Sequence, residues 1–274
     1  MDNFLNQISK DPYLFSVDDY MPSAWIGHAP FLKFLIREQK PDVFVELGVH
    51  NGFSYFVACQ SIQECRLSTK SFAIDHWLGD EQAGFFDNAV YESVQTLNSK
   101  YSTFSKLIKK SFAGALEDFP NSTVNLLHID GFHSYESVRQ DFESWLPKMG
   151  KNGIILMHDV HVRRDSFGVY KFWKEIKAQY KTIEFVDSHG LGVVFLGEVP
   201  PGNLSKLVDI ANSGHLSQIQ GTFGSISVDV IQGSCIQEIK SAIAERDNAI
   251  AERDKIMNSR TWRALRLYRL IRRR

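Results

Sequence analysis

Acidic residues and histidines follow two short apolar stretches of this chain, at positions where they could act on one ligand. The stretch 124–130 ends in Asp130, and the stretch 153–159 ends in His158 and Asp159. Two carboxylates and an imidazole can bind a divalent cation, and His133, three residues after Asp130, could accept a proton. The alternative is that the aspartates cap a helix or a turn and that the histidines are structural. Four such residues at two strand ends favour the site.

A glycine-containing segment provides a second group of candidates. Glu46, Gly48, Gly52 and Ser54 lie between a β-branched, apolar stretch and a helix-like one. Glycines let the backbone approach a ligand, and a helix N-terminus favours an anion, although a tight strand-to-helix turn would look the same. Asp75 ends the next apolar stretch, where nucleotide-binding folds bond ribose hydroxyls. The glycine spacing is not GxGxxG and no Walker lysine follows, so neither NAD nor ATP is favoured.

Both groups of residues depend on a regular alternation of strands and helices. This alternation predicts an α/β fold with a mostly parallel sheet covered on both faces, and ligands of such sheets bind at the carboxyl ends of the strands. The expected strands are residues 42–46, 71–75, 124–130 and 153–159, with an antiparallel edge hairpin at 183–186 and 192–196. The expected helices are residues 29–38, 54–60, 89–101, 113–119, 134–146 and 167–180.

The formal net charge of −1 hides an uneven distribution of charge. The last 15 residues contain seven arginines and no acid, so residues 1–259 carry −8. Arginine and apolar residues interleave in 260–274 as in a basic amphipathic helix, which predicts binding to an anionic membrane surface. Nucleic acid and an acidic protein partner are the competing ligands for this tail, and the interleaving disfavours nucleic acid.

Residues 201–259 differ in character from the alternating part. Residues 201–235 are rich in Ser and Gly, which predicts a linker or a small irregular subdomain. Residues 236–259 contain a seven-residue repeat, AIAERDN followed by AIAERDK, with Ile236, Ile243, Ile250 and Met257 at one heptad position. Because Arg246 and Arg253 occupy the other core position, a solvated helix competes with a short coiled coil; we favour weak homo-oligomerisation.

Composition limits where the chain acts. The chain has 274 residues and 43% hydrophobic residues, enough for a core, and no apolar run approaches the roughly 20 residues that span a bilayer. No signal peptide is visible, and three cysteines without CxxC spacing argue against a disulfide framework or structural zinc. We expect a cytoplasmic protein, peripheral on the inner face of the cytoplasmic membrane.

Several stretches of the sequence that contain these residues resemble class I S-adenosylmethionine-dependent methyltransferases, above all those associated with bacterial surface-polysaccharide glycosyltransferases. The resemblance covers roughly residues 42–197 and is carried by VELGVHNGFSYF, AIDHWLGDEQAGFF, LLHIDGFHSYESVRQDFESWLPKMGKNGIILMHDV, DSFGVYKFW and HGLGVVFLG. It implies a Rossmann-like, seven-stranded sheet with S-adenosyl-L-methionine over the first strands. The residues implied to hold the amino-acid end of the cofactor are Glu46, Gly48, Gly52 and Ser54. Asp75 would bind its ribose, and Trp77, Ser111 and Phe112 would lie near its adenine.

Residues 130–159 are also similar to the metal-dependent catechol-type O-methyltransferases. In that family an Asp ends one strand, an Asp-Asn pair ends the next, and a lysine base follows the first Asp by three residues. The matching positions are Asp130, His158-Asp159 and His133, so Asp130, His158 and Asp159 would bind a divalent metal and His133 would be the catalytic base. Because His158 replaces a hard oxygen ligand, manganese or another transition ion competes with magnesium, and a metal-free histidine base is the alternative.

The resemblance implies an O-methyltransferase that acts on a sugar hydroxyl of a surface polysaccharide or glycolipid. The rival hypotheses are a small-molecule O-methyltransferase acting on a macrolide sugar or a phenol, and a non-catalytic scaffold of a glycan-assembly complex. The tail also is similar to C-terminal segments of glycosyltransferase-associated proteins. The expected organisation is an N-terminal helical cap (1–40), a methyltransferase domain (41–200), a linker or subdomain (201–235), a heptad helix (236–259) and the basic tail (260–274).

Overall fold

The structure, a computed structural model, describes residues 2–81, 84–164 and 166–259. The chain divides into two compact units, residues 1–231 and residues 232–274. The first unit contains the sheet and the helices that cover it, and the second contains the continuation of the last helix. The basic tail, residues 260–274, lies outside the described residues, so membrane binding through it stays a prediction.

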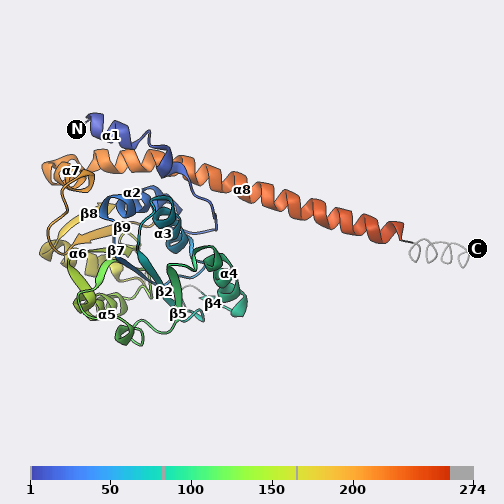
Figure 1. The fold of residues 1–274 in the computed structure, drawn as a ribbon, viewed down its shortest axis with the longest axis horizontal. Helices are drawn as coiled ribbons and strands as arrows, with labels where there is room; N and C mark the ends of the chain where they lie inside the picture. Colours follow the sequence, from blue (N-terminus) through green and yellow to red (C-terminus); the bar gives the residue numbers. More distant parts are fainter. Residues whose placement is uncertain (1, 82–83, 165, 260–274) are drawn as a thin grey trace, which may run out of the picture. The chain divides into compact units, whose positions relative to one another are not determined.

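Seven strands form one sheet in the order β5-β2-β1-β6-β7-β9-β8 (Figure 1). The strands are β1 (Val43–Leu47), β2 (Lys70–Asp75), β5 (Ser105–Lys109), β6 (Val124–Ile129), β7 (Met149–His158), β8 (Lys181–Phe185) and β9 (Leu191–Phe195). Neighbouring strands from β5 to β7 pair in parallel, and β9 is antiparallel to β7 and β8. The predicted mostly parallel sheet with an antiparallel edge hairpin is confirmed.

Helices cover both faces of this sheet (Figure 1). One face packs against α2 (Ala29–Gln39), α3 (Phe53–Glu64), α7 (Asn203–Ile210) and the beginning of α8 (Leu216–Asn258), and the other against α5 (Tyr135–Trp145) and α6 (Val169–Gln179). Two further helices are α1 (Asp2–Ile8) and α4 (Asn88–Asn98). Because side chains alternate along a strand, Phe44 enters the first core and Val45 the second.

Residues 201–235, which we expected as a linker or a small irregular subdomain, are helical. Here α7 is followed by a π-helical turn (Ala211–His215) and by α8. Within the first unit, Ile219, Phe223, Ile226 and Val230 of α8 are buried in the core beside α2. Their spacing of three and four residues is that of an apolar helical stripe, which the many Ser and Gly residues of this stretch conceal.

In the second unit α8 continues as a helix to Asn258, as the heptad pattern predicts. Ile236, Ile243, Ile250 and Met257 are all exposed there. Self-association through this stripe remains a prediction. No helix in the described part of the chain is both long enough and apolar enough to cross a membrane.

Candidate active site

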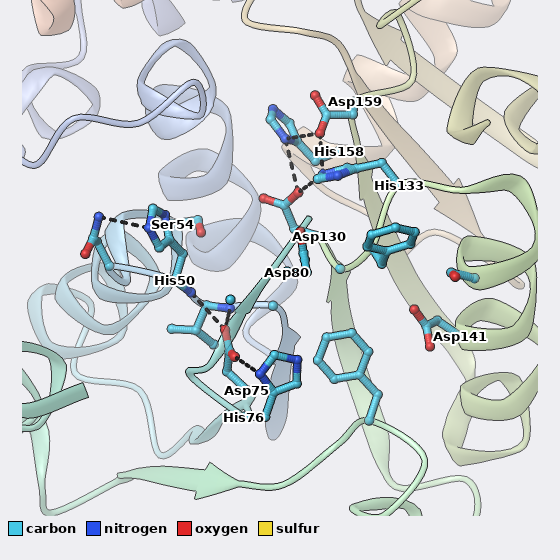
Figure 2. Close-up of a pocket in the computed structure, with 18 of the residues that line it drawn as sticks. His50, Ser54, Asp75, His76, Asp80, Asp130, His133, Asp141, His158 and Asp159 are labelled. Atoms are coloured by element: carbon cyan, nitrogen blue, oxygen red, sulfur yellow. Dashed lines mark hydrogen bonds and ion pairs between the residues drawn. The ribbon is translucent and has the colours of Figure 1, made fainter. Parts of the chain in front are cut away.

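A cavity of about 600 Å³ opens at the carboxyl ends of the central strands. Its size is typical of a site for a cofactor or a small ligand. The sequence-predicted site residues that line it are Gly48, Gly52, Ser54, Asp75, Ser111, Phe112, Asp130, His133, His158 and Asp159. Figure 2 shows the side chains that point into it. The fold therefore brings both predicted groups of residues, which are distant along the chain, to one cavity.

The turn after β1 passes close to the first residue after β6. Gly48 has φ +84°, and a Cβ built on it would lie 2.0 Å from the backbone oxygen of Asp130, so a larger residue would push the two segments apart. Gly52, with φ +87°, then leads directly into α3. These glycines place the open N-terminus of α3 beside the residues that follow β6.

Asp75 fixes the conformation of this turn (Figure 2). Its Oδ2 accepts hydrogen bonds from the backbone N–H groups of Val49 (2.8 Å) and His50 (3.0 Å), and its Oδ1 accepts one from Trp77 N–H (2.7 Å). The carboxylate at the end of β2 is thus held by three backbone donors on the wall of the cavity. A role in binding ribose stays a prediction, and positioning the glycine turn is a role that the sequence did not show.

Glu46 lies beneath the cavity rather than on its wall. Its side chain is fully buried; Ser54 Oγ donates to its Oε1 at 2.8 Å, and His128 Nδ1 lies 3.0 Å from its Oε2. Trp25 Nε1–H donates to His128 Nε2 at 3.1 Å. Because an indole can only donate, His128 Nε2 is unprotonated and the proton of the neutral ring is on Nδ1, facing Glu46. Burial raises the pKa of Glu46, and His128 and Ser54 oppose that rise.

Trp77 also lies off the cavity wall, in contrast to its expected place beside an adenine ring. It is buried, and its ring centroid lies 4.8 Å from that of Tyr91. Its Nε1 donates to the backbone oxygen of His50 at 3.0 Å. A positive φ of 50° at Trp77 turns the chain directly after β2, and the side chain packs inward. The residue supports the cavity without facing it.

The ends of β6 and β7 bring two carboxylates and two imidazoles together (Figure 2). His133 Nε2 lies 2.7 Å from Asp159 Oδ2 and 3.7 Å from Asp130 Oδ1. His158 Nδ1 lies 3.3 Å from the same Asp130 oxygen and 3.6 Å from Asp159 Oδ2. We call these four residues the Asp-His cluster. The parallel pairing of β6 with β7 produces it, because the two strands end at the same edge of the sheet.

A further shell of polar groups orients the Asp-His cluster. The backbone oxygen of Ser188 lies 3.0 Å from His158 Nε2, which must therefore donate and leaves Nδ1 directed at Asp130. His28 Nε2 contacts the same oxygen at 3.1 Å, and His189 Nδ1 lies 3.1 Å from Asp159 Oδ1. No spacing in the sequence indicated that His28, Ser188 or His189 belongs to this site.

The charges of the Asp-His cluster shift its pKa values in opposite directions. Burial would raise the pKa of Asp130, but His158 and His133 hold it well below its usual range. Burial would lower the pKa of His133, but Asp130 and Asp159 raise it to about 9. The same balance raises the pKa of His158 to about 10. The cluster thus favours ionised carboxylates with positive charge between them.

The donor set of the Asp-His cluster fits a divalent cation. One ligand atom from each of Asp130, His133 and Asp159 lies within 4.8 Å of the others. His158 Nδ1 is at comparable distances from both carboxylates. Carboxylate oxygen and imidazole nitrogen are both metal ligands, and a mixed set suits transition ions better than Mg²⁺. His133, which the sequence predicted as the base, therefore also lies within ligand distance of both carboxylates.

Other residues on the cavity wall were not singled out from the sequence. His50 stacks on Phe86, with ring centroids 4.6 Å apart, and both line the cavity. Asp80 and Asp141 contribute carboxyl groups. Asp80 ends β3 (Gly79–Asp80), which pairs antiparallel with β4 (Gly84–Phe85), and the sequence did not indicate this pair of short strands. Asp141 lies on the cavity side of α5, within a stretch that we predicted only as a helix.

Comparisons with known proteins agree with this geometry. Residues 45–160 match the family described as "Methyltransferase domain". An uncharacterised protein of Sinorhizobium fredii, y4gI, is 42% identical over 205 residues, which are 75% of this chain. The chain spans only 22% of that relative's length.

Two solved structures share the fold at low sequence identity. Cofactor-bound Rv0187 from MTB has 13% identity and a TM-score of 0.50, over 72% of this chain and 96% of its own. A protein from Corynebacterium glutamicum has 11% identity and a TM-score of 0.50, over 74% of this chain and 93% of its own. Residues 45–160 thus match a methyltransferase-domain family, and the strand order is that of a mostly parallel, Rossmann-like sheet.

Proposed function

We propose that the chain transfers the methyl group of S-adenosylmethionine to a hydroxyl group, assisted by a divalent cation at Asp130, His158 and Asp159. The observation that carries this proposal is the shared cavity: a glycine turn at a helix N-terminus forms one side, and the Asp-His cluster forms another. A cofactor on the first side and an acceptor at the second would meet inside one cavity.

The glycine-turn side fits a cofactor with an anionic amino-acid end. Gly48 and Gly52 permit a tight turn with positive φ, and α3 begins directly after it at Phe53, where the N–H groups of a helix N-terminus attract a carboxylate. Ser54 faces the cavity while its hydroxyl bonds to Glu46. Asp75 holds the turn in place, so that this surface is preformed.

The reaction breaks the sulfonium–methyl bond and forms a new bond from the methyl carbon to the acceptor oxygen. The hydroxyl must lose its proton, and we assign His133 Nε2 as the group that takes it. A cation bound to the carboxylates of Asp130 and Asp159 would offset the negative charge that raises the pKa of His133 to about 9, and would so leave its imidazole neutral and able to accept the proton. A cation beside the acceptor would supply positive charge where negative charge develops as the proton leaves. The products are a methyl ether and S-adenosylhomocysteine, and the proton ends on His133.

His133 is held for this task by two contacts. Its Nε2 lies 2.7 Å from Asp159 Oδ2, and its ring stacks on Phe167 with centroids 4.6 Å apart. A fixed base next to the acceptor converts proton transfer into a step within one complex. Asp130 Oδ1 also lies near, 3.7 Å from the same nitrogen.

The acceptor that we propose is a sugar hydroxyl of a surface polysaccharide or glycolipid. The cavity wall includes several polar side chains, among them His50, His76, Asp80 and His189. Such groups can bond the several hydroxyls of a sugar, whereas a phenol ring would gain more from apolar walls. The proposed tail at 260–274 would keep the enzyme near a membrane-linked acceptor.

The test is methyl transfer from radiolabelled S-adenosylmethionine to purified lipid-linked glycans. We expect label in the glycan, loss of labelling with a chelator, and recovery on adding Mn²⁺ or Mg²⁺. If the glycan is labelled equally fast with and without the chelator, the proposed role of the cation is wrong. If calorimetry detects no binding of S-adenosylhomocysteine, the transferase proposal is wrong and the scaffold hypothesis replaces it.

The proposed membrane contact has a separate test. Removing residues 260–274 should abolish binding to vesicles that contain anionic lipid and leave methylation of a soluble acceptor unchanged. The full chain with zwitterionic vesicles is the control, because the proposed attraction depends on anionic headgroups. Equal binding of the full and shortened chains to anionic vesicles would remove the tail from the proposal.

A further inference from the structure

Asp141 is a carboxyl group of the cavity that the proposed reaction does not use. It lies on the cavity side of α5, away from the Asp-His cluster (Figure 2). Its neighbour across the wall is Phe112, and Gly131 lies between them. A Cβ built on Gly131 would lie 2.4 Å from the Phe112 ring and 3.3 Å from Asp141 Oδ2. The bare glycine therefore lets an aromatic ring and a carboxyl oxygen border the same part of the cavity.

Asp141 has no partner for its carboxyl group among the residues that the structure describes. Ser144 Oγ bonds to the backbone oxygen of Asp141, at 3.2 Å, and not to its side chain. Glu143, on the outer side of the same helix, pairs with Arg139 at 2.7 Å. Burial alone raises the pKa of Asp141 to about 7, with no cation nearby to lower it. Asp141 is half-buried, so its carboxyl group is partly desolvated, and a ligand that brings a donor gains from meeting it.

The part of the cavity beside Asp141 suits a flat ring that carries an N–H group. Phe112 supplies an aromatic surface, and aromatic rings favour stacked or edge contacts with other rings. The carboxylate end of the proposed cofactor belongs at the other side, where α3 begins after Gly52. The base of the same cofactor is then left for the side of Phe112 and Asp141.

We propose that a carboxyl oxygen of Asp141 accepts a hydrogen bond from the exocyclic amino group of the cofactor's adenine, which makes Asp141 a specificity-determining residue. This inference rests on the proposed use of S-adenosylmethionine. A carboxyl group retains an acceptor oxygen whether or not it is protonated, so the contact forms in either state. Above pH 7, where the carboxyl group is ionised and can only accept, a base with an oxygen in place of the amino group would bring a second acceptor against Asp141, so the two bases are compared at pH 8 or above.

The test compares two ligands by calorimetry: S-adenosylhomocysteine and S-inosylhomocysteine, in which oxygen replaces the amino group. We expect the unchanged chain to favour the adenine ligand by about 10-fold or more, as an unpaired polar group costs 1–3 kcal/mol. Asp141→Ala should weaken binding of the adenine ligand and abolish that preference. Asp141→Asn keeps the shape, and its amide can donate to the inosine oxygen, so the preference should narrow or reverse.

Glu143→Gln is the matched control, since it changes an exposed carboxylate of the same helix outside the cavity. It should leave the affinities for both ligands unchanged. Equal losses for both ligands in Asp141→Ala, or no loss for either, would overturn the assignment of Asp141 alone. If the unchanged chain binds neither ligand, the proposed function fails, and this inference fails with it. Circular dichroism at the assay temperature establishes that each variant is folded.

Discussion

Two walls of one cavity carry carboxyl groups in opposite surroundings. Asp130 faces His133 and His158, and its pKa lies well below the usual range although burial opposes this. Asp141 faces no cation among the described residues, and burial raises its pKa to about 7. The same buried setting therefore yields a charged carboxylate on one wall and an easily protonated one on the other. Partners rather than depth decide what a buried carboxyl group can do.

The difference separates two kinds of ligand contact. The Asp130 wall concentrates negative charge and imidazole nitrogen, which suits a cation and a proton transfer. The Asp141 wall offers an acceptor of low charge beside an aromatic ring, which suits a neutral N–H donor. A methyl transfer between a large cofactor and a polar acceptor needs both kinds of surface in one cavity. Substitutions on the two walls should accordingly affect different measurements.

The largest effect is expected from Asp130→Asn on the charged wall. Removing this charge should lower methyl transfer on the order of 10³-fold, because several kcal/mol of stabilisation at the reacting oxygen is lost. Affinity for S-adenosylhomocysteine, measured by calorimetry, should change little. Asp118→Asn, which breaks an exposed pair with Lys110, is the control and should retain activity. Full activity in Asp130→Asn would refute the assignment of the acceptor to this wall.

His158→Asn tests whether the nitrogen on the charged wall selects the metal. We expect affinity for Mn²⁺ and Zn²⁺ to fall about 10- to 100-fold and affinity for Mg²⁺ to change less, since imidazole suits the transition ions. Competition against a chromophoric chelator measures each ion without requiring turnover. His215→Asn, an exposed histidine outside the cavity, serves as the control. A uniform loss for all three ions would show that His158 is not the selective ligand.

Asp141→Asn tests the uncharged wall through the pH dependence of stability. The pKa of Asp141 is about 7 in the folded chain against an ordinary 3.8, so the folded chain binds more protons than the unfolded chain between these values. Its contribution to stability therefore falls as pH rises through that window, by about 1.4 kcal/mol per pH unit. Denaturant unfolding should show the unchanged chain losing stability relative to the variant as pH rises. If the difference in unfolding free energy between the two proteins does not change with pH, the raised pKa of Asp141 is wrong.

The Asp130 wall could be predicted from the sequence, whereas the Asp141 wall could not. Asp130, His158 and Asp159 end apolar strands, and parallel neighbours must finish at one edge of the sheet. Asp141 sits inside a helix, and its meeting with Phe112 depends on how α5 packs and on the bare Cα of Gly131. Strand ends are visible as a pattern along the chain, while contacts between a helix face and a distant loop are not.

The same distinction explains which elements of the fold could be predicted from the sequence and which could not. The central strands are continuous apolar runs and were recognised, but β5 (Ser105–Lys109) is an edge strand with two lysines and was not. Composition hid the apolar stripe of α8, because Ser and Gly outnumber Phe223 and Ile226 around it. The inward packing of Trp77 depends on its own positive φ, which the sequence does not indicate because the residue is not a glycine.

The smallest effect on ligand affinity is expected beneath the cavity, where the carboxyl group of Glu46 has surroundings unlike those of Asp130 and Asp141. It is fully buried like a core residue, and it meets Ser54 and the Nδ1 side of His128. Trp25→Phe removes the indole donor that keeps His128 Nε2 unprotonated. The unfolding free energy should fall by about 1–2 kcal/mol, and affinity for S-adenosylhomocysteine should fall only a few-fold, since the glycine turn is held independently by Asp75. Denaturant unfolding and calorimetry on the same variant separate the two outcomes. A loss of affinity as large as that of Asp141→Ala would instead mean that the Glu46 network, and not only Asp75, positions the turn.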